Sequence, residues 1–238
     1  MDILGVHYDL IAKTSRMTHA FFRALRINLD QYHPDTFTKR QYSSALGSLV
    51  FCNSGHPGSL SMCYSLIRLL RIRRGTPNEW QTIMPVQTLR LLKAVANRYM
   101  KLTPTRLQAH SPDLQLVYSD ACCSQLGITI PGKGSFYTPL EHSLKIFEAE
   151  ALALWAAIQQ TEGDVLVAID NQALHYAMRK GRSSTPYVNS LIRAIFGERQ
   201  SGRKILTKWI PTDSNPADVP SRWVHDVPIS HLEVIHWG

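Results

Sequence analysis

The sequence has no long apolar runs. None reaches the roughly 18 residues that a membrane-spanning helix needs. The opening residues, MDILGVHYDLIAK, carry acidic side chains where a secretory signal peptide carries basic ones. We therefore expect neither a membrane span nor secretion.

Cysteine is also scarce. The four cysteines, Cys52, Cys63, Cys122 and Cys123, form no C-x-x-C pair, and the two adjacent ones lack the spacing of a zinc site. We expect reduced, mostly buried thiols, which are typical of cytosolic or nuclear proteins.

Acidic residues are few and unevenly placed. The 238 residues hold 18 acidic and 26 basic side chains, a net charge of +8. Residues 1–112 contain 15 basic and 5 acidic side chains, whereas residues 113–238 contain 11 basic and 13 acidic ones. This asymmetry suggests that the first half of the chain binds a polyanion and that the second half needs its carboxylates.

The first half is expected to be mainly helical. A strand over 3–10 and a turn over 12–16 precede helices at 39–51, with Thr38 as its cap, and at 59–71 and 86–100. A linker follows at 102–112. The second helix runs into an arginine cluster that could contact phosphates, although a solvated helix end is the alternative. The cluster consists of Arg68, Arg71, Arg73 and Arg74.

From residue 113 onward, strands alternate with helices, the pattern of an α/β sheet domain. The expected strands cover 114–121, 126–130, 135–140, 164–170 and 204–210. The expected helices cover 143–160, 171–180, 185–200 and 215–223.

Two of these strands end in an aspartate after an apolar run, LQLVYSD at Asp120 and VLVAID at Asp170. A charge at the end of a buried strand is costly unless it is paired or used. A solvated aspartate that begins a turn is the alternative for either residue alone.

The helix over 143–160 offers two glutamates, Glu148 and Glu150. At roughly 100° per residue, Glu150 lies at the edge of the apolar stripe and Glu148 points about 100° from its centre. Only Glu150 should face the sheet, where an unpaired carboxylate costs several kcal/mol. The stripe consists of Leu144, Phe147, Ala151, Leu154 and Ile158.

A fourth carboxylate, Asp218, follows the last strand within WIPTDSNPADVPSRW. By itself, Asp218 is explained as an aspartate in the first turn of a helix, where the helix dipole favours a negative charge. As a set, the four carboxylates could meet at one sheet edge, where they would repel one another unless divalent cations were bound. Oxygen ligands without His or Cys favour Mg²⁺, with Mn²⁺ possible, over zinc.

Four segments in order, VYSDA, AEALALWAAI, VAIDNQAL and NPADVPSR, resemble the D-E-D-D series of retroelement ribonuclease H domains. NPADVPSRW is similar to the matching segment of hepadnavirus polymerases and of VIPER- and DIRS-type tyrosine-recombinase retrotransposons.

The resemblance implies a ribonuclease H-like mixed five-stranded sheet with flanking helices, preceded by a mainly helical thumb-like region. It implies an endoribonuclease that cuts the RNA strand of RNA–DNA hybrids with two Mg²⁺ ions. Asp120 would bridge both ions, Asp218 would complete the site that activates water, and Glu150 and Asp170 would hold the second ion.

The resemblance extends upstream. ILGVHYDLIAKTSRM resembles the strand hairpin at the primer grip of a reverse transcriptase palm, and FTKRQYSSALGSLVF resembles the start of a thumb and connection. The implied parts are the end of a palm (1–15), a thumb/connection-like region (16–112), a ribonuclease H domain (113–225) and a C-terminal tail (226–238).

The implied partners are an RNA–DNA hybrid and the rest of a polymerase polypeptide, with no membrane; the oligomeric state is open. The sequence has no Asp-Asp dipeptide, so we expect no DNA synthesis by this chain alone. The loop before Asp218 also lacks the histidine common in the family, which implies slow or differently timed turnover.

Two other functions remain open. One is a catalytically silent scaffold that binds nucleic acid, although no carboxylate of the series is lost. The other is a DNA-directed, integrase-like nuclease, which usually ends its carboxylate series with glutamate. Asp218 favours ribonuclease H.

Overall fold

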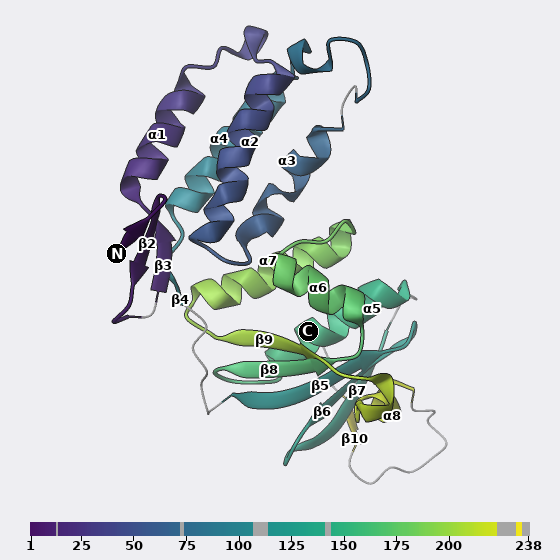
Figure 1. The fold of residues 1–238 in the computed structure, drawn as a ribbon. Coiled ribbons are helices and arrows are strands. Elements are labelled where there is room, and N and C mark those ends of the chain that lie inside the picture. The colour runs from purple at the N-terminus through teal and green to yellow at the C-terminus, as the bar shows by residue number, and fades with distance from the viewer. Residues whose placement is uncertain (13, 72–73, 107–113, 141–143, 223–231, 235–238) are drawn as a thin grey trace. The chain divides into compact units, whose positions relative to one another are not determined.

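The structure is a computed structural model of the whole chain. It describes all residues except 13, 72–73, 107–113, 141–143, 223–231 and 235–238, and only the backbone of 105–106 and 232–234. The chain divides into two compact units (Figure 1). Unit 1 comprises residues 1–109 and 200–202, and unit 2 comprises residues 110–199 and 203–238. Among the described helices, none combines the length and the apolar character needed to cross a bilayer.

Unit 1 begins with an antiparallel sheet in the order β1-β2-β3-β4. Its strands are β1 (Asp2–Ile3), β2 (Val6–Asp9), β3 (Thr14–Met17) and β4 (Thr105–Arg106). The turn expected over 12–16 is wrong for residues 14–16, which belong to β3 and pair with β2, whereas Ala12 does lie in a turn and residue 13 is outside the described residues. Ser15 and Met17 alternate inward in β3, and the buried Ser15 hydroxyl donates to the Gly55 carbonyl at 2.9 Å. This long-range partner compensates the burial of a polar side chain.

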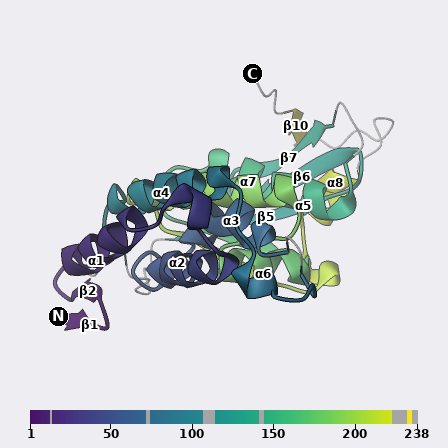
Figure 2. The same ribbon diagram turned by 90° about the horizontal axis from the view of Figure 1, so that it is seen from above.

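Four helices complete unit 1, and α1, α2 and α4 lie side by side (Figures 1 and 2). The Thr38 cap is confirmed, since its hydroxyl accepts from Gln41 N while the Gln41 side chain accepts from Thr38 N at 2.8 Å. The helix expected over 59–71 is shorter than predicted, because a 3-10 helix occupies Ser59–Cys63. The helices are α1 (His19–Asp30), α2 (Lys39–Phe51), α3 (Tyr64–Leu69) and α4 (Val86–Met100).

Unit 2 is built on a sheet in the order β10-β7-β6-β5-β8-β9. The pairs β5–β6 and β6–β7 are antiparallel, whereas β5–β8 and β8–β9 are parallel. The five expected strands and the mixed sheet are confirmed. A sixth strand, β10, adds to β7 in a segment that we expected to be a tail. The strands are β5 (Gln115–Ala121), β6 (Gln125–Ile130), β7 (Gly134–Pro139), β8 (Val165–Ile169), β9 (Ile205–Trp209) and β10 (Leu232–Val234).

Three longer helices, α5 (Ile146–Gln159), α6 (Gln172–Lys180) and α7 (Pro186–Gln200), lie on one side of this sheet (Figure 1). The last helix, α8 (Asp218–Ser221), has only four residues, fewer than the expected 215–223, whose final residue lies outside the described part. Leu126 and Ile128 of β6 point into the core that contains α5. Gly127, between them, faces α8, so α8 lies on the opposite face.

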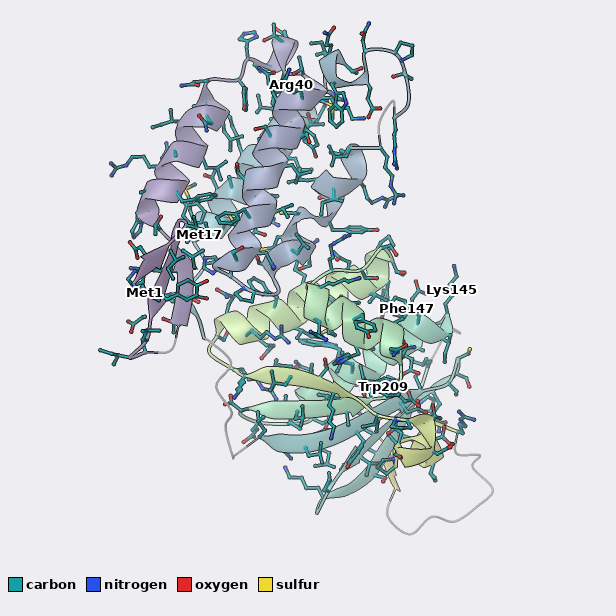
Figure 3. All side chains as sticks on the ribbon, viewed as in Figure 1. Met1, Met17, Arg40, Lys145, Phe147 and Trp209 are labelled. Carbon is teal, nitrogen blue, oxygen red and sulfur yellow. The ribbon has the colours of Figure 1, made fainter. Side chains whose placement is uncertain are left out.

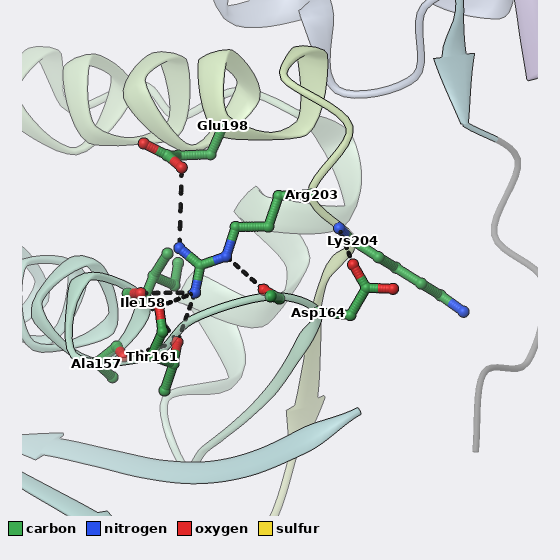
Figure 4. A network of polar contacts seen from close by, with 8 residues as sticks. Ala157, Ile158, Thr161, Asp164, Glu198, Arg203 and Lys204 are labelled. Carbon is green, nitrogen blue, oxygen red and sulfur yellow. Dashed lines mark hydrogen bonds and ion pairs between the residues drawn. The ribbon is translucent and has the colours of Figure 1, made fainter. Parts of the chain in front are cut away.

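The C-terminal end of α5 is fixed by Arg203 (Figure 4). Its Nη2 donates to the carbonyl oxygens of Ile158 at 2.9 Å and Thr161 at 2.5 Å, and its Nε donates to that of Gly163 at 2.5 Å. The last carbonyls of a helix have no partner within the helix. Arg203 supplies such a partner to Ile158, and its bonds to Thr161 and Gly163 hold the loop that follows α5, the helix that carries Glu150.

Candidate metal centre

Asp120 and Asp170 lie at the same edge of the unit 2 sheet. Tyr118 of β5 is in register with Ala168 of the parallel strand β8, so Asp120 and Asp170, each two residues further on, come next to each other at the carboxyl ends. Asp120 is only 3% exposed, and Asp170 is half-buried. The indole of Trp209, labelled in Figure 3, donates to the Asp170 carbonyl at 2.9 Å and holds that backbone in place.

Glu150 reaches this edge from α5. It is 6% exposed, as expected for the glutamate on the sheet-facing stripe, whereas Glu148 is half-buried rather than exposed. The buried surface of α5 is wider than the expected stripe because many of its residues are alanines, which allow close packing. The buried alanines are Ala149, Ala151, Ala153, Ala156 and Ala157.

Carboxylate oxygens of Asp120, Glu150 and Asp170 all lie within 4.8 Å of one another. Oε2 of Glu150 is buried and has no hydrogen-bond partner. Burial, reinforced by the charges of Asp120 and Asp170, raises the pKa of Glu150 to about 9. Burial is also the main cause that raises the pKa of Asp120. Three crowded carboxylates, one with an unsatisfied buried oxygen, are the electrostatic setting that a bound cation relieves.

Asp218 lies beside this group but is not part of it. It is the first residue of α8, and its side chain is 33% exposed. Its Oδ1 forms an ion pair with Nη2 of Arg222 at 2.8 Å, while its charge contributes to the raised pKa of Asp120. The structure therefore brings three of the four expected carboxylates together and places the fourth nearby, paired with an arginine.

The position of α8 depends on residues that the sequence did not single out. A Cβ at Gly127 would lie 2.3 Å from Ser221 N and 2.5 Å from the Ala217 carbonyl oxygen, so only glycine allows α8 to approach β6. Gly127 is paired with Asp120 across the two strands. A glycine within a strand marks a close backbone approach, and this signal was available in the sequence.

The residues present fit a hard divalent cation. Asp120, Glu150 and Asp170 offer only oxygen ligands, and no histidine or cysteine belongs to the group. Such ligands suit Mg²⁺ or Mn²⁺. The roles of the four carboxylates as metal ligands remain a prediction.

The arginine cluster lies in unit 1. Arg68, near the end of α3, and Arg71 and Arg74, beyond it, are exposed, whereas Arg73 lies outside the described residues. The Arg68 guanidinium lies 5.8 Å from the centre of the Tyr64 ring. Exposure leaves these three side chains accessible to phosphates, and their role in binding also remains a prediction.

No protein-family model matches the chain, and none of the curated proteins matches it. Among solved structures, ribonuclease H1 from Halobacterium salinarum is similar at 15% identity and a TM-score of 0.37, over 44% of this chain and 92% of that one. LC11 ribonuclease H1, solved with an RNA/DNA hybrid, is similar at 16% identity and a TM-score of 0.36, over 44% of this chain and 91% of that one.

A foamy viral protease-reverse transcriptase, solved with an RNA/DNA hybrid, is similar at 14% identity and a TM-score of 0.37. The match covers 96% of this chain and 31% of that one, so this chain spans about a third of its length. With its mixed sheet, its flanking helices and this strand order, unit 2 has a ribonuclease H-like fold.

Proposed function

We propose that unit 2 is a divalent-cation-dependent endoribonuclease that hydrolyses the RNA strand of RNA–DNA hybrids, as part of a retroelement reverse transcriptase. The observation that carries this proposal is the group of Asp120, Glu150 and Asp170, whose oxygens lie within 4.8 Å of one another. The buried and unpartnered Oε2 of Glu150 makes the group costly without a cation. The large majority of buried polar atoms in proteins are hydrogen-bonded, so this unpartnered oxygen favours a bound cation over a purely structural cluster.

These three carboxylates, with Asp218, would hold Mg²⁺ or Mn²⁺. When bound, such ions lower the pKa of water and stabilise charge at a phosphoryl group. The chain's own contribution is to hold the carboxylates rigidly. Asp120 belongs to β5 and Asp170 directly follows the adjacent parallel strand β8, and the C-terminal end of the helix of Glu150 is held by Arg203.

Unit 1 would bind the nucleic acid without reading its sequence. The exposed Arg68, Arg71 and Arg74 are suited to phosphate contacts, which fix position but carry little sequence information. The excess of basic residues in 1–112 supports the same role. The resemblance of 3–17 and 37–51 to palm and thumb segments supports placing the chain in a reverse transcriptase.

Cleavage of end-labelled substrates in Mg²⁺ tests the proposal. The wild-type chain should cut the RNA of a hybrid, and Asp170→Asn should lower the rate by about 100-fold or more, because it removes a ligand charge with little change of shape. Glu150→Gln should act similarly. Glu148→Gln, on the same helix but outside the group, is the matched control and should cut at close to the wild-type rate.

The same assay separates the alternatives. Cleavage of duplex DNA in preference to hybrid would support the integrase-like nuclease, and binding without cleavage of any substrate would support the silent scaffold. Equal cutting by wild type and Asp170→Asn would overturn the metal assignment.

A further inference from the structure

The hydroxyl of Ser221 lies against the candidate metal centre. Ser221 ends α8 and is completely buried. Its single hydroxyl proton points to Asp120 Oδ2 in the shorter contact, at 2.5 Å, while the Asp218 carbonyl is a second acceptor at 2.9 Å. The two residues are 101 positions apart in the sequence. The Ser221 hydroxyl is therefore a direct neighbour of a carboxylate that belongs to the group of three.

The backbones on both sides of this hydrogen bond are anchored separately. Next to Asp120, the Ser119 carbonyl accepts from Nδ2 of Asn215 at 3.1 Å. Next to Ser221, the Pro220 carbonyl accepts from Nε2 of Gln125 at 2.7 Å. Both contacts are buried, and both join the segment before and within α8 to β5 or β6. The donor and the acceptor are thus held at a fixed separation.

This hydrogen bond restricts the Asp120 side chain. A carboxyl group with one oxygen held by a fixed donor has fewer orientations open to it, and its remaining lone pairs keep a defined direction. An ionised Asp120 is repelled by the charges of Asp170 and Asp218, and carboxylate oxygens of Asp170 and Glu150 lie within 4.8 Å of its own. Without the hydroxyl, repulsion would favour rotation of Asp120 away from them.

We propose that Ser221 is a positioning residue for the metal centre, whose hydroxyl orients Asp120 so that its free lone pairs face Glu150 and Asp170. This inference rests on the proposed function, since it assumes that the carboxylates bind a cation. Partners that orient a metal ligand commonly change metal affinity by about 10- to 100-fold. The same range is expected here.

Binding of Mn²⁺ to the full chain, measured by calorimetry or by loss of the free-ion electron paramagnetic resonance signal, tests the inference without an activity assay. Ser221→Ala should weaken Mn²⁺ binding by about 10- to 100-fold. Thr129→Val is the matched control, because the Thr129 hydroxyl contacts the Pro216 carbonyl at 3.3 Å and touches the same segment without reaching Asp120. It should bind within about threefold of wild type, the scatter expected for context effects.

Each outcome is decisive. If wild type binds Mn²⁺ and Ser221→Ala binds equally well, the positioning role is wrong and the proposed function stands. If Ser221→Ala and Thr129→Val weaken binding equally, packing of the segment explains the effect and the role is again wrong. If wild type binds no Mn²⁺, the proposed function itself fails. Should Ser221→Ala not fold, Ser221→Cys, which fills the space of the hydroxyl with a slightly larger thiol that donates weakly, is measured instead with the same expectation.

Discussion

Gly127 gives the sharpest test of how the candidate metal centre is built. In Gly127→Ala the new Cβ would lie 2.3 Å from Ser221 N, 2.5 Å from the Ala217 carbonyl oxygen and 2.8 Å from Ser221 Cα. Ordinary contacts are about 3.5–4.0 Å, so α8 would have to move by roughly 1 Å. All three atoms belong to the backbone and cannot be relieved by a side-chain rotation.

The expected loss of stability follows from this geometry. Overpacking of this kind costs about 1–3 kcal/mol, and displacement of α8 also stretches the Ser221–Asp120 and Gln125–Pro220 hydrogen bonds. We expect the upper end, about 3 kcal/mol. At about 2–4 °C per kcal/mol for a domain of this size, the midpoint of the unit 2 transition should fall by roughly 6–12 °C. Binding of Mn²⁺ should weaken as well, because α8 carries Asp218 and Ser221.

Differential scanning calorimetry and Mn²⁺ titration measure both effects. Gly197→Ala is the control within the same unit, since a Cβ there would meet no atom within 4 Å. It should stabilise α7 by up to about 1 kcal/mol, because alanine is the better helix former. A Gly127→Ala protein that melts and binds Mn²⁺ like wild type would refute the close approach of α8 to β6.

Three further predictions concern other sites. Thr38→Ala should lower the stability of unit 1 by about 1 kcal/mol because it removes the capping box, whereas Thr38→Ser keeps the hydroxyl and should not. Equal urea midpoints for wild type and both variants would contradict this. Burial lowers the pKa of His56 from 6.5 to about 4, so the unfolded chain binds a proton first and the stability of unit 1, which contains His56, should fall by about 3 kcal/mol as pH drops from 6.5 to 4. Urea midpoints across this range measure the fall, and His56→Leu should flatten it. Arg222→Gln removes a positive charge beside the carboxylates and releases Asp218 from its ion pair. The affinity for Mn²⁺ should therefore rise several-fold. A decrease in affinity would mean that Arg222 supports the site.

The parts that could be predicted from the sequence are those set by local patterns. The segments that lead up to Asp120 and Asp170 are apolar runs with a charge at the end, and helical spacing separates Glu150 from Glu148. The Thr38 cap depends on a residue three positions away. Each of these signals lies within one element, where periodicity and propensity act directly.

The parts that could not be predicted depend on partners distant in the sequence. Strand β3 looks like a turn because its residues are polar, and the burial of Ser15 is compensated only by Gly55, 40 positions away. The short strand β10 joins the sheet beside β7, where Leu232 pairs with Ser135, a residue about 100 positions earlier in the sequence. The contact of Ser221 with Asp120 joins residues 101 positions apart. No local pattern contains such information.

Asp218 differs from the other carboxylates in what holds it in place. Asp120 lies on β5, Asp170 directly follows the paired strand β8, and Glu150 lies on a helix of 14 residues. By contrast, α8 has four residues and is too short to be stable by itself. Its position therefore depends on tertiary contacts, chiefly the close approach at Gly127 and the hydrogen bond from Gln125. Substitutions at these two uncharged residues should consequently damage the metal centre much as loss of Asp218 would, and mutagenesis limited to acidic residues would not detect them.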